Sequence, residues 1–435
     1  MSIRRRALDA LIDITDNGAY ANLRLKALPR DMQERDIAWI NAAVYTTLEH
    51  LLYIDHVLKH FTNGKINRVI RGILRLGICQ LLYMDVPQSA VCNESVKLAK
   101  ETGKGALSSF VNGVMRSICR SLDDLPPLPT EIRDRLSIQY SYPHYIVDEY
   151  LHFYGAEFTE AMLSSCNLRG MTIRAQYPYS THELAQNLDQ RKIKYARGSV
   201  VPDAFKLENG IDVTAETLFI EGKITVQSEG AMLASMALGI QPGMHVLDAC
   251  AAPGGKSAYI SHLMCGDGSI VAWELHEHRA ELMDKTLHRL NVLNVQTQVR
   301  DASVFDPEYE RCFDAVLVDA PCSGLGITGK PDARYSKSAA IIINLAQIQS
   351  AILDTCARYV RPGGVLVYST CTVSNQENEA QAEAFLHGHT QFKPESMADI
   401  VHESQRKRAE SGAMQLFPHL DGTEGFFIAK FRREV

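Results

Sequence analysis

The sequence predicts an α/β protein in which a doubly wound parallel sheet follows an all-helical bundle and a small α+β module. Helical periodicity without strand-like alternation runs through the first 120 residues. Strand-like "MTIRAQY" and "KIKYAR" follow a helical stretch, and from residue 240 apolar runs alternate with amphipathic segments. We therefore expect domains over 1–122, 131–225 and 226–435, with the proline-rich "DDLPPLPT" as the first linker.

The helical part is basic, although the whole chain is acidic. Residues 1–120 carry 17 Lys+Arg against 11 Asp+Glu, a balance of +6 in a chain whose net charge is −6. This asymmetry favours a polyanionic partner, with an ordinary solvated basic face as the alternative. Within 65–84, arginines fall opposite the apolar helical face. We expect phosphates to contact a surface made of Arg68, Arg71, Arg75, Lys97, Lys100 and Lys104.

Composition and the N-terminus favour a soluble cytoplasmic protein. The apolar share of 46% and the charged share of 22% are ordinary globular values. Asp9 and Asp13 interrupt the apolar stretch that a signal peptide needs, and no uninterrupted apolar run approaches membrane-spanning length. The ten cysteines include no CxxC pair, which argues against a zinc site or a thioredoxin-like centre. We expect a monomer without metal and without a membrane partner.

The C-terminal half alternates strands and helices at the spacing of a doubly wound sheet. The expected strands are 244–249, 269–274, 295–300, 313–318 and 364–369. The expected helices are 256–264, 277–290, 340–360 and 377–387. A last apolar run, "GFFIAKF" at 425–431, follows the turn "DGTEG" and is expected to add an antiparallel edge strand.

Carboxylates end three successive strands of this sheet. Asp248 ends the first, before the glycine-containing turn "AAPGGKS"; Glu274 and Asp301 end the next two. In this fold class such positions accept hydrogen bonds from a ribose and an adenine, whereas an isolated acid is usually a helix N-cap. Because the turn lacks the GxGxxG pattern of nicotinamide dehydrogenases, S-adenosyl-L-methionine is the better-fitting ligand.

Two cysteines lie just beyond strand ends: Cys322 in "DAPCSG" and Cys371 in "YSTCT". A disulfide, a metal site, core packing and covalent catalysis would each place thiols there. Covalent catalysis has a chemical reason, because a thiolate that bonds transiently to a substrate replaces one difficult step with two easier ones. The sequence alone does not say which cysteine attacks.

The segments "DACAAPGGK", "DAPCSGLG", "PDARYSK", "YSTCTVSNQENE" and "DGTEGFF" occur in one order. Together they resemble the RNA cytosine-C5 methyltransferases, and among these the bacterial 16S rRNA enzymes of the Sun/Fmu (RsmB) type. The resemblance covers about 225–431, and the helical part from "RRRALDAL" onward is similar to the NusB-like RNA-binding bundle. It implies a Rossmann-like methyltransferase sheet behind an all-α NusB-like bundle.

The resemblance assigns roles residue by residue. It implies that Cys371 is the nucleophile, that Cys322 acts in product release as the base for the carbon 5 proton, and that Asp319 contacts ring nitrogen N3. It also implies that residues 421–427 line the substrate side. The cofactor-binding set that it implies is Cys250, Ala251, Ala252, Pro253, Gly254, Gly255, Lys256, Glu274, Asp301 and Asp319.

This sequence departs from the family pattern at two places. In "ITGKPDARYSK" the residues before the Pro-Asp pair differ, and Tyr335 follows where the family has tryptophan; we expect Tyr335 to stack and Arg334 to contact phosphate. In "VQSEGAML" Ser228 replaces an aspartate. The expected function is methylation of a 16S rRNA cytosine. A tRNA cytosine-C5 methyltransferase, a non-catalytic NusB-like RNA adaptor and a nicotinamide oxidoreductase are the alternatives.

Overall fold

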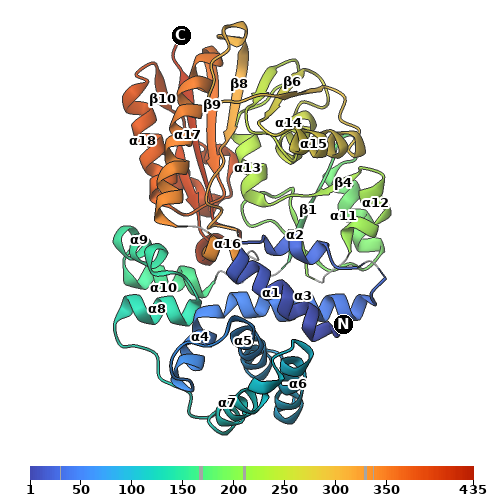
Figure 1. Cartoon of the computed structure of the whole chain (residues 1–435). Coiled ribbons are helices and arrows are strands. Elements are labelled where there is room, and N and C mark those ends of the chain that lie inside the picture. Colours follow the sequence, from blue (N-terminus) through green and yellow to red (C-terminus); the bar gives the residue numbers. More distant parts are fainter. Residues whose placement is uncertain (30, 166–169, 209–211, 328–330, 337) are drawn as a thin grey trace. The chain divides into compact units, whose positions relative to one another are not determined.

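The structure is a computed structural model that describes residues 1–29, 31–165, 170–208, 212–327, 331–336 and 338–435. The chain forms two compact units (Figure 1). Unit 1 comprises Met1–Ser164 and Lys330–Ser338, and unit 2 comprises Ser165–Gly329 and Ala339–Val435. The three domains expected at 1–122, 131–225 and 226–435 remain a prediction. The helices after residue 131 belong to unit 1, and the strands after residue 170 belong to unit 2.

Unit 1 is helical throughout its described residues. Its longer helices carry apolar residues at helical spacing, which form one buried core. The helices are α1 (Ile3–Asn17), α2 (Ala21–Lys26), α3 (Glu34–Glu49), α4 (Leu51–His60), α5 (Arg68–Tyr83), α6 (Gln88–Glu101), α7 (Ser108–Arg120), α8 (Ile132–Tyr140), α9 (His144–Tyr154), α10 (Ala156–Ser164) and α16 (Asp332–Ser336).

The expected apolar face of α5 is confirmed, but one member of the expected basic surface is not. Ile70, Ile73 and Leu74 are buried in the core of unit 1. Arg75 is buried as well, and its guanidinium donates to both carboxylate oxygens of Asp55 at 2.7 and 2.6 Å. Because this arginine already has a fixed carboxylate partner, its assignment to the phosphate-binding surface was wrong.

The segment 331–336 belongs to unit 1, although it lies between strand and helix segments of unit 2 in the sequence. The Asp332 carboxylate accepts a hydrogen bond at 3.0 Å from the Ala21 backbone amide, at the start of α2. Since the N-cap residue of α2 makes no side-chain hydrogen bond, Asp332 caps that helix from a distant part of the chain.

Arg334 and Tyr335 are also bound within unit 1. The Tyr335 hydroxyl lies 3.0 and 2.9 Å from the backbone carbonyl oxygens of Leu48 and Ser141. Arg334 is buried, lies over the ring of Tyr142 and donates to the Tyr140 carbonyl. The expectation that Tyr335 stacks on a base and Arg334 contacts phosphate was therefore wrong, because both side chains are already engaged by protein groups.

Unit 2 contains a small antiparallel sheet in the order β2-β3-β1-β4. Its strands are β1 (Met171–Ala175), β2 (Tyr195–Arg197), β3 (Phe205–Leu207) and β4 (Ile224–Val226). The helices α11 (Thr181–Gln190) and α12 (Thr217–Ile220) belong to the same part, and Leu184 and Leu188 of α11 pack with Ile173 and Phe205 of the sheet. This region is the expected α+β part of the chain.

The main sheet has the order β10-β12-β9-β8-β5-β6-β7, with β11 also paired to β12. The five strands from β9 to β7 are parallel, and the others are antiparallel. The strands are β5 (His245–Asp248), β6 (Ser269–Glu274), β7 (Val295–Val299), β8 (Phe313–Asp319), β9 (Val360–Thr370), β10 (Phe392–Pro394), β11 (Ala413–Leu416) and β12 (Phe426–Arg433).

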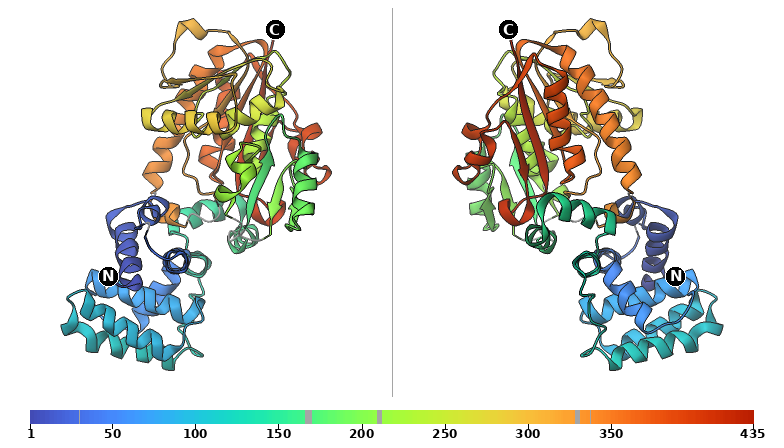
Figure 2. Two further views of the ribbon diagram at one scale, coloured as in Figure 1. Left: turned by 90° about the vertical axis from the view of Figure 1, so that its right-hand side faces the viewer. Right: turned by 90° about the vertical axis from the view of Figure 1, so that its left-hand side faces the viewer.

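Helices cover both faces of the main sheet (Figure 2). An apolar cluster lies between the sheet and the helices on each face. The helices α13 and α14 pack on one face, and α17 and α18 pack on the other. The helices of this part are α13 (Glu229–Ala237), α14 (Gly255–Leu263), α15 (Glu277–Arg289), α17 (Ala339–Tyr359), α18 (Glu379–Gly388), α19 (Arg406–Ala409) and α20 (Pro418–Asp421).

The expected strands and helices of this half are confirmed, with one difference. The strand formed by "GFFIAKF", β12, is antiparallel as expected, but it lies inside the sheet between β9 and β10. The short strand β10 lies outside it, so the edge assignment was wrong. The pattern of β12 agrees with this position, because Phe426, Phe427, Ile428 and Ala429 are all buried, as expected for a strand covered on both faces.

One helix, α17, is long and apolar enough to cross a membrane by length and composition. Its buried residues include Ile352, Leu353 and Cys356, which pack on the main sheet, and its buried Gln349 makes hydrogen bonds inside the protein. These contacts show that one side of α17 packs on the main sheet.

The fixed cap of α2 makes a stability prediction. Replacing Asp332 with Ala should lower the free energy of unfolding of unit 1 by about 1–2 kcal/mol, because the oxygen that caps α2 is lost. Denaturant unfolding followed by helical circular dichroism measures this. Asp31→Ala, at an exposed position, is the matched control and should change stability by less than about 0.5 kcal/mol. Equal effects of the two changes would contradict the capping role.

The buried carboxyl at the end of β5 predicts a pH dependence of stability. Burial raises the pKa of Asp248 to about 6 from the ordinary value of 3.8. The folded protein therefore binds this proton more tightly than the unfolded chain. This contribution to stability is present at low pH and is lost as pH rises through about 4 to 6, by about 3 kcal/mol.

Replacing Asp248 with Asn should remove this loss, so the variant should gain stability over the parent protein at pH 7.5 and lose that advantage at pH 4. Urea unfolding at several pH values measures the difference. Asp284→Asn, at an exposed position of α15, should leave the pH profile unchanged. A parallel pH profile for Asp248→Asn and the parent would show that Asp248 does not titrate in this range.

Candidate active site

The two cysteines singled out in the sequence lie side by side after neighbouring parallel strands. Strands β8 and β9 pair so that Asp319 is opposite Ser369. Cys322 follows three residues after Asp319, and Cys371 follows two residues after Ser369. The sulfur atoms are 3.2 Å apart, and neither forms a disulfide. The sheet register therefore brings together two thiols that are 49 residues apart in the chain.

The hydrogen bond between the two thiols affects the proton of Cys322. Its hydrogen bond with Cys371, together with burial, raises the pKa of the Cys322 thiol well above the usual range. Cys322 therefore keeps its proton and can donate it to the Cys371 sulfur. This geometry suits a pair in which Cys371 carries the reactive negative charge, since the thiolate and not the thiol is the nucleophile.

A lysine and a carboxylate lie beside the thiols. The Lys256 ammonium at the start of α14 is 2.6 Å from the Asp319 carboxylate, which also accepts at 2.9 Å from the Ser369 hydroxyl. Burial alone would lower the pKa of Lys256, but the charge and hydrogen bond of Asp319 and the charge of Cys371 raise it above its ordinary value. Lys256 is thus a fixed cation that favours a thiolate at position 371.

The turn before α14 has room and unused hydrogen-bonding capacity for a ligand. A Cβ added at Gly255 would meet no atom within 4 Å, whereas Gly254 has a φ of +95° that favours glycine. The buried Asp248 accepts from the Ser257 hydroxyl at 2.7 Å with one oxygen, and its other oxygen has no hydrogen-bond partner. The sheet order reverses beside β5, where ligands bind in this fold class.

The next two acids of the expected adenosine site differ in environment. Glu274 is buried, and its carboxylate accepts from the His276 amide and from Arg279, which also holds the Ala252 carbonyl. Asp301 is exposed and accepts from the amide and hydroxyl of Ser303. Arg279 is a residue that sequence reasoning missed, and it ties the carboxylate on β6 to the turn before α14.

The remaining residues of the expected cofactor turn lie between Asp248, at the end of β5, and the start of α14. Cys250, Ala251 and Ala252 come two to four residues after the end of β5, and Pro253 is exposed. The carboxylates of Asp248, Glu274 and Asp301 suit an adenosine-containing ligand, since they can accept from its hydroxyl and amino groups. Within the described residues, no group of three His, Cys, Asp or Glu side chains has the arrangement to hold a metal ion.

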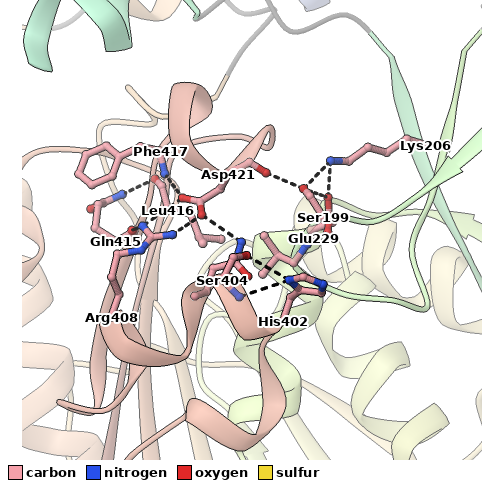
Figure 3. A network of polar contacts seen from close by, with 12 residues as sticks. Ser199, Lys206, Glu229, His402, Ser404, Arg408, Gln415, Leu416, Phe417 and Asp421 are labelled. Atoms are coloured by element: carbon pink, nitrogen blue, oxygen red, sulfur yellow. Dashed lines mark hydrogen bonds and ion pairs between the residues drawn. The ribbon is translucent and has the colours of Figure 1, made fainter.

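A buried ionic network fixes the 421–427 segment (Figure 3). Asp421 is buried, forms an ion pair with Arg408 and accepts from the Phe417 amide at 2.9 Å. The Ser199 hydroxyl donates to the Asp421 carbonyl at 2.5 Å, which links this pair to a second one between Lys206 and the buried Glu229. Asp421 is thus a structural anchor for the loop that follows it.

This anchored loop reaches the thiols through two glycines. The Gly425 amide donates to the Gly326 carbonyl at 2.9 Å, and the Gly326 amide donates to the Cys371 carbonyl at 3.0 Å. A Cβ at Gly326 would lie 2.0 Å from the Gly425 carbonyl oxygen, so only glycine fits there. At the other departure from the family pattern, Ser228 caps α13 by accepting from the Ala231 amide, as an aspartate there can also do.

Sequence reasoning also missed the residues that hold the cysteine loops from behind. Glu377 and Asn378 are buried and contact both loops, and Gln349 of α17 joins them. The signal was present in "SNQENE", because several polar residues followed a buried strand without an amphipathic pattern.

Comparison with known proteins agrees with this arrangement. The model of the 16S rRNA methyltransferase RsmB/F family matches residues 235–432, and that of the NusB family matches residues 1–120. A probable ribosomal RNA small subunit methyltransferase B of Bacillus subtilis is 36% identical over 100% of this chain and 99% of its own length. A protein of the same description from Synechocystis is 31% identical over the full length of both chains.

A solved structure is similar over the same extent. The crystal structure of PH0851 has a TM-score of 0.80 and 25% sequence identity, and the match covers 100% of both chains. The relatives therefore match the helical part as well as the part that contains the two thiols. On this full-length similarity, the chain belongs to the ribosomal RNA small subunit methyltransferase B family.

Proposed function

We propose that this protein methylates carbon 5 of a cytosine in 16S ribosomal RNA through a covalent bond between Cys371 and carbon 6. Family membership carries the coarser part, an S-adenosyl-L-methionine-dependent methyltransferase for ribosomal RNA. The observation that carries the finer part is the thiol pair, with sulfurs 3.2 Å apart beside Lys256 and Asp319. Proteins of this family act on RNA during ribosome synthesis, and we infer a cytoplasmic location.

Bound S-adenosyl-L-methionine supplies an electrophilic methyl group at the carboxyl ends of β5 and β8. Lys256 stabilises the Cys371 thiolate, which bonds to carbon 6 of the cytosine. The electrons of the carbon 5–carbon 6 double bond then make carbon 5 nucleophilic, so that it takes the methyl group and the cofactor leaves as its thioether. Asp319 and ring nitrogen N3 share a proton in the adduct, and this proton returns to solvent when the adduct breaks down. In this way the protein replaces one difficult step with two easier ones.

Cys322 acts in the second half of the reaction. Its raised pKa depends first on the hydrogen bond with Cys371, and that sulfur loses its negative charge when it bonds to carbon 6. Cys322 then releases its proton to solvent more readily. As a thiolate, it takes the proton from methylated carbon 5. The electrons of that carbon–hydrogen bond restore the double bond, and the carbon 6–sulfur bond breaks to return the Cys371 thiolate.

The helical unit is proposed to bind RNA phosphates through its exposed basic residues. Arg68, Lys97 and Lys100 are exposed and Lys104 is half-buried; Lys97 is paired with Glu94, and Arg71 with Asp16. Such contacts supply affinity more than sequence selection. The target base must be unpaired or flipped, because carbon 6 lies within the stack of a helix.

The cysteine roles give opposite results for two substitutions. Cys371→Ala should abolish methylation and form no adduct, whereas Cys322→Ala should accumulate a covalent protein–RNA complex, because the carbon 5 proton stays in place. Methyl incorporation from labelled cofactor and denaturing gel electrophoresis measure the two outcomes. Cys312→Ser, at an exposed cysteine, is the matched control and should leave both unchanged.

Full methylation by Cys371→Ala, or an adduct in Cys371→Ala and none in Cys322→Ala, would contradict these roles. Mapping 5-methylcytosine in 16S rRNA and in tRNA after incubation with the protein separates the proposed substrate from tRNA.

The phosphate contacts predict a salt dependence of RNA binding. The logarithm of the affinity should fall with the logarithm of salt concentration, by about 0.7–0.9 for each phosphate contacted. Lys97→Ala and Lys100→Ala should each reduce this slope by about that amount. Filter binding over a series of salt concentrations measures it. Lys59→Ala, an exposed lysine outside the expected surface, should leave the slope unchanged; a slope equally affected by all three changes would contradict the assignment.

A further inference from the structure

Glu377 is a buried carboxylate that takes no part in the chemistry proposed above. It ends the 3-10 helix η4 (Asn375–Glu377), is fully buried, and burial raises its pKa. Its carboxylate accepts from the amide and hydroxyl of Ser323 at 2.8 and 2.5 Å, and from the side-chain amide of Gln349 at 3.0 Å. A buried carboxylate without a cationic partner among these contacts is costly, so its position calls for a reason.

The contacts of Glu377 surround Cys322. Ser323 directly follows Cys322, and Gln349 also donates at 2.9 Å to the carbonyl of Pro321, directly before Cys322. The residues on both sides of this thiol are therefore held by Glu377 or by its partner Gln349. The Ser323 hydroxyl also lies 2.8 Å from the Thr372 hydroxyl, beside Cys371.

The neighbouring Asn378 holds the other thiol loop. Its side chain accepts from the Thr370 hydroxyl at 2.5 Å and donates to the Thr372 carbonyl at 3.0 Å. The Gln415 side chain donates to the same carbonyl at 3.3 Å. The Glu377 carboxylate also hydrogen-bonds the Thr372 side chain. The loop of Cys371 thus has supports from Asn378 and Gln415 in addition to Glu377, whereas the backbone amide and hydroxyl next to Cys322 are held by Glu377 itself.

We propose that Glu377 is a positioning residue for the release step: it holds Cys322 where that thiol can reach the proton on carbon 5, whereas Asn378 positions Cys371 for attack. This inference rests on the proposed covalent mechanism. It divides the two halves of the reaction between two adjacent buried residues. Loss of Glu377 should then resemble a partial loss of Cys322, and loss of Asn378 a partial loss of Cys371.

The experiment compares steady-state and single-turnover reactions of the full-length protein with 16S rRNA. Glu377→Gln keeps the size of the side chain but presents an amide to groups that donate to it. Its kcat should fall about 10- to 100-fold with little change in KM, since small misplacements have effects of that size. The covalent protein–RNA complex should accumulate. Asn378→Ala is the matched control, because it should slow formation of the complex without accumulation.

Ser323→Ala is the second variant, because it removes the hydroxyl between Glu377 and Thr372 and leaves the buried carboxylate in place. It should also accumulate the complex, and the double variant should be no worse than the more impaired single variant, as expected for residues in one hydrogen-bonded chain. Thermal unfolding and calorimetric binding of S-adenosyl-L-methionine should stay close to the parent values in variants that fold.

Wild-type turnover in both Glu377→Gln and Ser323→Ala, or slow formation without accumulation in both, would overturn the inference. These outcomes are distinguishable from failure of the proposed function itself. In that case Cys371→Ala would still methylate RNA, or Cys322→Ala would form no covalent complex, whatever Glu377 does.

Discussion

The parallel pairing of β8 with β9 is the constraint on which the rest of the site depends. Because Asp319 lies opposite Ser369, the loops that follow these strands leave the sheet at the same edge. This edge therefore brings together the two sulfurs, the Asp319 carboxylate and Lys256. A shift of one residue in this register would send alternate side chains to the other face of the sheet, and the thiol pair would not form.

The sheet also explains why the loops need additional support. Both cysteines lie beyond the last paired residues, where ladder hydrogen bonds no longer fix the backbone. Buried side chains replace those bonds: Glu377, Gln349 and Asn378 from behind, and the Gly326–Gly425 contact from the anchored 421–427 segment. Buried polar groups of this kind are tolerated because their partners are fixed in advance.

The sequence predicted the order of helices and strands well, because the spacing of apolar residues and the turn-forming glycines and prolines are local signals. The strands and helices of the main sheet, the apolar face of α5 and the pairing of cysteine positions with strand ends all follow from such patterns. Pairings between distant residues have no local signal. The ion pair of Arg75 with Asp55, the internal place of β12 and the engagement of Tyr335 by unit 1 could be found only with coordinates.

In the candidate site, too, some residues could be found from the sequence and others could not. Position at strand ends singled out the two cysteines and the acids, because few residue types perform those tasks, whereas Lys256 came from the family resemblance. The supporting residues were missed because glutamate and asparagine after a strand are usual in solvated turns. Arg279 was missed for a related reason, since an arginine on an amphipathic helix is most often exposed.

The place of residues 331–336 within unit 1 has a consequence for how such proteins recombine. A NusB-like bundle cut from this chain at residues 123–130 would lack the Asp332 carboxylate over α2 and the Tyr335 hydroxyl on the Leu48 carbonyl. Gene fusion or truncation at that linker therefore cannot transfer every contact of the bundle.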